Sequence, residues 1–143
     1  MNAVTGPQPC DNAAMLETMR IAASGMRAAA TRAANASNNI ANVHSAGAVN
    51  EDGYDGYVPT QVVQLTQEGG GVETALEPRS PAYRPAYQPS HPAANEQGIV
   101  GVPNTDYVPN FVELSQARMA YAAGAAVIRT AEQMARVAFS MKA

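Results

Sequence analysis

The two histidines, His44 and His91, are the first candidates for chemistry, because imidazole serves as a general base and as a metal ligand. Neither belongs to a closely spaced metal motif such as His-Glu-x-x-His. His44 follows a predicted helix, and His91 stands directly before Pro92 in a loop segment. Asp106 and Tyr107 approach His91 only if tertiary folding brings them there, and no spacing supports a catalytic set. We therefore expect that the chain is not an enzyme.

Two further segments are weak candidates for ligand binding. The acidic turn at residues 51–56 lacks the glutamate that a calcium loop needs at its twelfth position. The glycine run at residues 69–71 has no following Lys-Ser or Lys-Thr and precedes no helix, which argues against a phosphate cradle. Cys10 is the only cysteine, so neither an intramolecular disulfide nor a thiolate cluster can form. We expect no metal and no cofactor.

Composition excludes further classes of function. The formal net charge is −3, with 9 Lys and Arg against 12 Asp and Glu, which argues against nucleic-acid binding. No apolar run approaches the ~20 residues of a bilayer span, so we expect no membrane insertion. Residues 1–12 lack the basic start and apolar stretch of a cleavable signal peptide. Aromatic residues make up only 6% of the chain and many apolar residues are alanine, which predicts a thin core that depends on neighbouring chains.

The elements that must position these residues follow from the pattern of the chain. We predict a flexible leader at residues 1–14, an N-terminal helix at 15–42 and a C-terminal helix at 109–143, within one structural domain. The intervening segment, residues 43–108, holds the glycines and prolines that oppose helix. Alternation at 57–65 and 72–76 predicts a small β-hairpin, and residues 78–92 predict a proline-rich extended arm. The fold class is mainly α.

Both predicted helices carry a narrow seam at heptad spacing, which is typical of helices that pack as a coiled-coil-like pair. Both a parallel and an antiparallel pair fit these seams, and the same seams can instead meet other subunits. In the first helix the seam comprises Leu16, Met19, Ala23, Met26, Ala30, Ala33 and Ile40, with Asn42 as the helix-ending residue. In the second helix it comprises Leu114, Ala117, Tyr121, Gly124, Ile128, Ala131, Ala135 and Ala138.

Particular motifs resemble a known family. The run Ile-Ala-Ala-Ser-Gly-Met at 21–26, then Arg32, then Asn-Asn-Ile-Ala-Asn at 38–42, resembles the N-terminal signature of flagellar rod, hook and related axial proteins. The runs at 91–98, 102–104, 113–114 and 117–121 are similar to the proximal rod proteins of the FlgC family. The resemblance covers about residues 15 to 141. Its motif residues are Ser24, Gly25, Asn39, His91, Pro92, Asn95, Gly98, Pro103, Asn104 and Arg118.

The resemblance implies a structural subunit of the proximal rod of the bacterial flagellar basal body, which polymerises through its terminal helices and transmits torque. It implies contact with other rod subunits, with further copies of the chain and with the flagellar export apparatus. The implied location is the periplasmic rod, reached without a cleavable signal peptide. Departures are Gly124 for asparagine, Glu132 for lysine and an insertion at 47–57. The alternatives are a divergent rod paralogue and a helical adaptor or export chaperone with a single flagellar partner.

Overall fold

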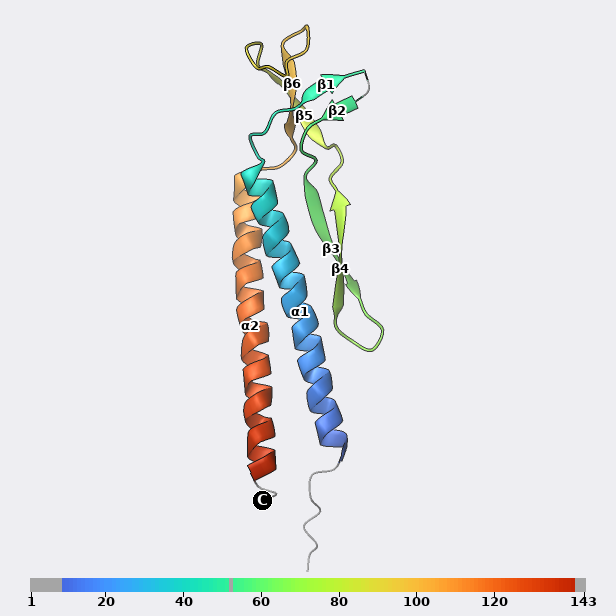
Figure 1. Cartoon of the computed structure of the whole chain (residues 1–143), viewed down its shortest axis with the longest axis vertical. Coiled ribbons are helices and arrows are strands. Elements are labelled where there is room, and N and C mark those ends of the chain that lie inside the picture. The colour runs from blue at the N-terminus through green and yellow to red at the C-terminus, as the bar shows by residue number, and fades with distance from the viewer. Residues whose placement is uncertain (1–8, 52, 141–143) are drawn as a thin grey trace, which may run out of the picture.

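The chain folds around two long helices that lie side by side and run in opposite directions (Figure 1). The structure, a computed structural model, describes residues 9–51 and 53–140, with side chains from Ala13 onward. Helix α1 spans Pro9–Ala41 and helix α2 spans Tyr107–Ser140. Within the described residues, the segment between the helices contains three antiparallel strand pairs. The prediction of a mainly α fold with β-hairpin structure between two terminal helices is confirmed, and the pair is antiparallel.

The helix boundaries differ from the predicted ones. Helix α1 begins at Pro9, so residues 9–14 of the predicted leader are helical, and residues 1–8 lie outside the described part of the chain. Proline is favoured at the first position of a helix because its missing N–H has no partner there anyway. The side chain of Asn42 donates to the carbonyl oxygen of Asn38 at 2.9 Å, just after the last helical residue. Helix α2 begins at Tyr107, two residues before the predicted start, with Pro109 in its first turn.

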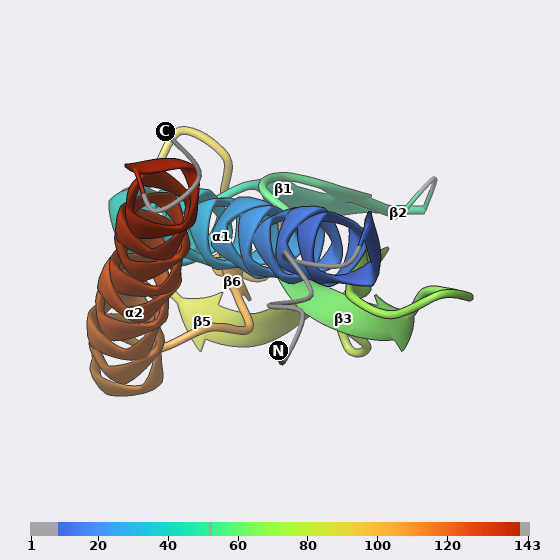
Figure 2. The ribbon, with the colours of Figure 1, turned by 90° about the horizontal axis from the view of Figure 1, so that it is seen from below.

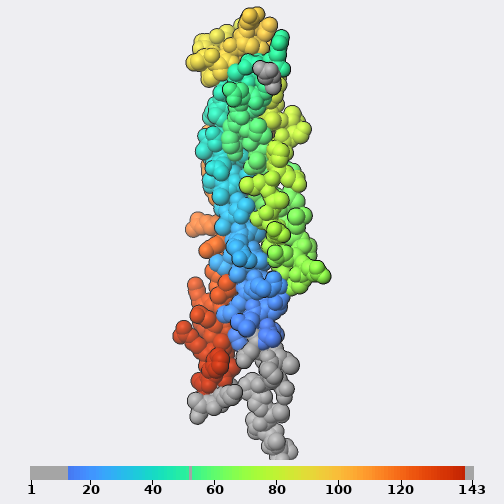
Figure 3. Space-filling view, turned by 45° about the vertical axis from the view of Figure 1, so that its right-hand side comes forward, coloured from blue at the N-terminus to red at the C-terminus, as the bar shows by residue number. Residues whose placement is uncertain are grey.

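The predicted hairpin is confirmed as strands β3 (Thr60–Thr66) and β4 (Val72–Pro78). Their register runs from Thr60 opposite Pro78 to Thr66 opposite Val72. All three glycines of the turn at 69–71 have positive φ, between 85° and 94°, which side chains with a Cβ rarely adopt. The hairpin lies along the length of α1 on the side away from α2 (Figures 1 and 3).

The prediction of an unpaired extended arm at 78–92 is wrong for residues 83–87. These residues form strand β5 (Tyr83–Tyr87), which pairs with β6 (Ile99–Pro103). Pro85 is tolerated in β5 because each strand of a two-stranded sheet keeps one unpaired edge. Strands β1 (Ala48–Asn50) and β2 (Gly53–Asp55), which were not predicted, form the third pair. A backbone bridge between Gly47 and Gly101 joins this pair to β6 at the end of the molecule where α1 finishes.

The core is thin, as the composition predicts. Among the residues whose side chains are described, five of the seven buried apolar ones are alanine; the set is Ala28, Ala29, Ala36, Val43, Val100, Ala117 and Ala131. Viewed along the long axis, the two helices tilt in different directions, and they separate toward the start of α1 and the finish of α2 (Figures 1 and 2). In the described residues, neither helix combines the length and hydropathy that crossing a membrane requires.

Candidate assembly interface

The seam of α2 faces α1 along most of its length. Ala117 and Ala131 are buried, whereas Tyr121 is 47% exposed and lies at the edge of the contact. The half-buried members of this seam are Leu114, Gly124, Ile128, Ala135 and Ala138. Two of the eight predicted seam positions of α2 are thus buried in the described chain.

The seam of α1 does not coincide with its buried stripe. Leu16 is 68% exposed and Ala30 is exposed, whereas Ala29 and Ala36, each one position before an expected heptad position, are buried. The physical reason is that α1 has two partners, because the β3–β4 hairpin covers the face beside the one that meets α2. The buried stripe therefore widens toward the hairpin. Half-buried members of the predicted seam are Met19, Ala23, Met26, Ala33, Ile40 and Asn42.

A groove opens where α1, α2 and the hairpin meet. It encloses about 500 Å³ and is lined mainly by small or apolar side chains, including Ala22 and Val127. A Cβ on Gly124, which also lines the groove, would lie 2.6 Å from Cγ of Met26, so the Met26 side chain occupies the space that a side chain at position 124 would need. A Cβ on Gly25, in the same groove, would meet nothing within 4 Å. Gly124 is thus required by packing, and Gly25 is not.

The helices and the hairpin are tied together by Asn39, whose side chain is completely buried. Its Nδ2 donates to the carbonyl oxygen of Thr60 at 3.0 Å and to Oδ1 of Asn110 at 3.2 Å. The hydroxyl of Tyr57 donates to Oδ1 of Asn39 at 2.9 Å, and burial raises the pKa of that hydroxyl. Three separate segments therefore meet on one family-motif residue.

Sequence reasoning missed the other members of this polar cluster. Asn35 donates to the carbonyl oxygen of Thr60 at 3.0 Å and accepts from its hydroxyl at 2.5 Å. Asn110 donates to the hydroxyl of Thr105 at 2.8 Å, and both residues are buried. The available signal was the spacing of Asn35 and Asn39, since residues four apart share one helix face.

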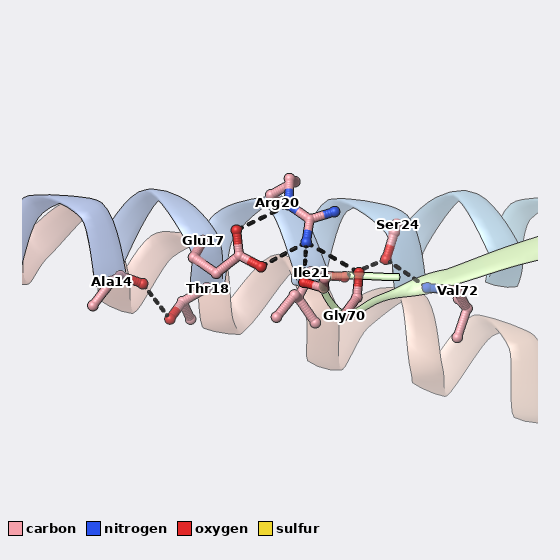
Figure 4. A network of polar contacts seen from close by, with 9 residues as sticks. Ala14, Glu17, Thr18, Arg20, Ile21, Ser24, Gly70 and Val72 are labelled. Atoms are coloured by element: carbon pink, nitrogen blue, oxygen red, sulfur yellow. Dashed lines mark hydrogen bonds and ion pairs between the residues drawn. The ribbon is translucent and has the colours of Figure 1, made fainter. Parts of the chain in front are cut away.

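The tip of the hairpin is fastened to α1 by Arg20 and Ser24 (Figure 4). Nη2 of Arg20 donates to the carbonyl oxygens of Gly69 at 2.5 Å and Gly70 at 3.1 Å. Ser24 is buried, and its hydroxyl oxygen accepts a hydrogen bond from the Val72 amide at 3.1 Å. The Ser24 of the family motif thus holds the start of β4.

Two ion pairs accompany these contacts. Arg32 of α1 pairs with Glu113 of α2, and this hydrogen bond raises the pKa of the guanidinium. Glu17 pairs with Arg20 on the surface of α1, and the hydrogen bond from Arg20 lowers the pKa of the Glu17 carboxyl. The first pair fixes the two helices to each other, and the second orients the arginine that holds the hairpin tip.

The motif at 91–98 forms the turn between β5 and β6. Oδ1 of Asn95 accepts hydrogen bonds from the amides of Gln97 at 3.1 Å and Ile99 at 2.9 Å. Nδ1 of His91 accepts from the amide of Ala93 at 3.1 Å, which gives this histidine a role in the turn. Gly98 has a φ of 76°, where a Cβ would also lie 2.9 Å from Tyr87.

The remaining motif residues have separate environments. Pro103 is buried in β6, and Asn104 donates to the carbonyl oxygen of Pro81 at 3.0 Å. Pro92 and Arg118 are exposed. Across the described residues, no three His, Cys, Asp or Glu side chains gather closely enough to hold a metal ion. The motif therefore organises the fold, and only its exposed members are free to meet another molecule.

The outer face of α2 carries large apolar side chains that contact neither α1 nor the hairpin closely enough to be buried. Val108 is 75% exposed and Met119 is 62% exposed. Their companions are Phe111, Val112 and Val137. Exposed large apolar side chains that share one helix face mark a candidate site of protein interaction. We name this set the outer face of α2.

Comparison with known proteins agrees with this arrangement. The flagellar basal-body rod protein FlgC of Salmonella typhimurium is 32% identical over 127 residues, which cover 85% of this chain and 92% of the relative. The protein of the same name from Escherichia coli O157:H7 is 32% identical over 130 residues, with the same coverage. No family model matches the chain. At this identity, sustained over nearly the whole length of both proteins, the chain belongs to the FlgC family of flagellar basal-body rod proteins.

Proposed function

We propose that the chain is a structural subunit of the proximal rod, which polymerises through exposed helix faces and transmits torque without carrying out catalysis. Its partners are further copies of itself and other rod subunits. The outer face of α2 carries this proposal, because its exposed valine, methionine and phenylalanine side chains have no cover within the described chain. Covering them releases about 25 cal/mol for each Å² of apolar surface removed from water.

The spacing along α2 suits a contact with another elongated molecule. Val108, Val112 and Met119 are separated by four and seven residues, which places them on one side of the helix. The opposite side is occupied by the seam that meets α1. A helix with one face buried internally and another face apolar is suited to packing in a bundle made of several subunits.

Torque transmission is supported by the way the helices are joined. The Asn39 cluster and the pair of Arg32 with Glu113 connect α1, α2 and the hairpin near one end. A side-by-side helix pair of 33 and 34 residues is about 50 Å long at 1.5 Å per residue. Load applied at one end of such a unit passes along hydrogen-bonded helices to the other.

We further propose that the chain reaches the periplasmic rod through the flagellar export apparatus, without a cleavable signal peptide. The family membership supports this route.

The proposed assembly through the outer face of α2 is tested by replacing Met119 with Asp in a strain that lacks the native copy, with Met119→Leu as the matched control. We expect the leucine variant to restore swimming and to appear in purified basal bodies, whereas the aspartate variant does neither. Far-UV circular dichroism of both purified variants checks that the helices are intact.

The alternatives give different results in the same strains. An adaptor or export chaperone would be absent from purified basal bodies even when the wild-type chain restores swimming. A divergent paralogue with a specialised partner would leave swimming intact after its deletion. Absence of the wild-type chain from basal bodies, or intact swimming after its deletion, would contradict the proposed function.

A further inference from the structure

Three arginines of α2 form a basic stripe on its surface. Arg118, Arg129 and Arg136 are exposed and stand 11 and 7 residues apart. At about 100° per residue, these separations place all three within about 20° of one another around the helix. The described part of the chain offers none of them an ion-pair partner within 4.0 Å. Glu132 lies at the edge of the stripe and is the acidic residue nearest to it along α2.

The basic stripe points away from the hairpin of its own chain. The groove beside the hairpin is lined from α2 by Ala120, Ala123 and Val127. On the helix these alanines and Val127 lie to one side of the buried Ala117, and the arginines lie about 100° to the other side. Carboxylates on the hairpin therefore cannot neutralise the stripe within one molecule.

The hairpin carries the complementary charge. Glu73 and Glu77 of β4 are exposed and four residues apart, so both lie on the same face of the strand. Side chains of adjacent strand residues point to opposite faces of the strand. Because Val72 lines the groove against the helices, Glu73 and Glu77 lie on the outward face. Their partners across the strands are Leu65 and Gln61, which bring no positive charge. We name this surface the acidic face of the hairpin.

The spacing of the two charged surfaces matches. Glu73 and Glu77 are about 13 Å apart along a strand that rises about 3.3 Å per residue. Arg129 and Arg136 are about 10 Å apart along a helix that rises 1.5 Å per residue. Arginine side chains are long enough to span the difference, and bidentate pairing of a guanidinium with a carboxylate is among the stronger polar contacts.

We propose that the basic stripe on α2 of one copy docks against the acidic face of the hairpin of a second copy. The stripe and the acidic face lie on opposite sides of α1 in the same molecule, since α1 separates α2 from the hairpin (Figure 1). Such a contact is head-to-tail, so a pair of copies still offers one unused stripe and one unused acidic face, and the array can grow by adding further copies. This inference names the partner surface used in the proposed polymerisation and rests on that function.

Charge reversal tests the contact. Three variants are expressed in a strain without the native copy. The first double variant combines Arg129→Glu and Arg136→Glu, and the second combines Glu73→Arg and Glu77→Arg. The quadruple variant carries all four changes. We expect each double variant to lower the amount of chain in purified basal bodies at least fivefold. The quadruple variant, in which the charges are exchanged, is expected to recover to within twofold of wild type.

The outcomes separate this inference from the proposed function. If the wild-type chain is missing from basal bodies, the proposed function fails. If the wild-type chain is present and the double variants assemble equally well, or the quadruple variant does not recover while its circular dichroism is normal, the docking contact alone is overturned. Loss of assembly in the arginine variant only would assign the stripe to a different partner and would also overturn it.

Discussion

The two ends of the helix pair are built differently. At the strand end, residues 28–41 of α1 and 107–117 of α2 meet the strands, and a buried polar cluster joins the three parts. The free end comprises residues 13–27 of α1 and 118–140 of α2. Its buried residues are Ser24 and Ala131, and the hairpin tip covers Ser24. A second cavity of about 270 Å³ opens between the helices there, beside Met15 and Met134.

The difference teaches that alanine-rich seams alone do not complete a core. Both ends place small residues between the helices, but the buried polar hydrogen bond that joins α1 to α2, from Asn39 to Asn110, lies at the strand end. The free end leaves Leu16, Met134 and Phe139 exposed. It is the part of the molecule that gains most from a neighbouring subunit.

The largest expected effect comes from removing the strand end's central side chain. Asn39→Ala removes the buried partner of the Tyr57 hydroxyl and of Oδ1 of Asn110, and we expect a loss of about 3 kcal/mol in the free energy of unfolding. Urea denaturation followed by circular dichroism measures it. Asn38→Ala, at the exposed neighbouring position, is the control and should cost under about 1 kcal/mol. Equal losses of stability for the two variants would show that the buried polar cluster around Asn39 does not stabilise the strand end.

A smaller loss is expected from releasing the hairpin at the free end. A Cβ on Gly71 would lie 2.6 Å from the Ser24 hydroxyl, and the φ of 94° disfavours any side chain. We expect Gly71→Ala to cost about 1–2 kcal/mol and to speed amide hydrogen exchange at Val72. Gly69→Ala is the control, because it has a similar φ of 85° but only an arginine side chain at 3.7 Å. Unchanged exchange at Val72 in Gly71→Ala would show that the tip is not fastened to α1.

The free end can also be strengthened. Gly25→Ala adds a methyl group where nothing lies within 4 Å, so we expect a gain of about 0.8–1 kcal/mol from helix propensity. Gly124→Ala adds the same group 2.6 Å from Cγ of Met26 and should instead be a net loss, since the packed Met26 side chain must move. Urea denaturation of the two variants measures both signs. A gain for Gly124→Ala would mean that the helices do not approach closely there.

The smallest effect concerns pH at the free end. The hydrogen bond from Arg20 lowers the pKa of Glu17 in the folded chain, so this contact stabilises the fold above the unfolded pKa of about 4.3. Its contribution is lost as the pH falls through the folded pKa. Carboxyl chemical shifts recorded by NMR during an acid titration measure the midpoint, and Arg20→Gln should move it upward. A midpoint unchanged by that substitution would contradict the pairing.

Much of the architecture could be predicted from residue spacing. The two helices and the β3–β4 hairpin follow from local periodicity and from the glycine turn, which act over short distances along the chain. The rotation of α1 could not be predicted, because the burial of Ala29 and Ala36 in place of heptad positions depends on a hairpin folded back onto the helix. Strand β5 was missed because its proline-rich sequence indicates an extended arm, and its partner β6 follows only after an 11-residue connection.

The candidate assembly surface was harder to infer than the fold. The seam residues were predicted as one set, but packing divides them between an internal contact, as at Ala117, and an outward position, as at Leu16. Asn39 was identified through its resemblance to a family motif, whereas Asn35 and Asn110 carry no motif and become recognisable only when their partners are in place.

The antiparallel pairing of the first and last helices also determines when the molecule can close. Arg32 and Glu113 are 81 residues apart along the chain, and Asn39 and Asn110 are 71 apart. At about 5–20 residues per second, a ribosome finishes α2 roughly 5–20 s after it finishes α1. Throughout that interval α1 has no helix to pair with. Any factor that recognises its unpaired face therefore has seconds in which to bind before the chain itself covers it.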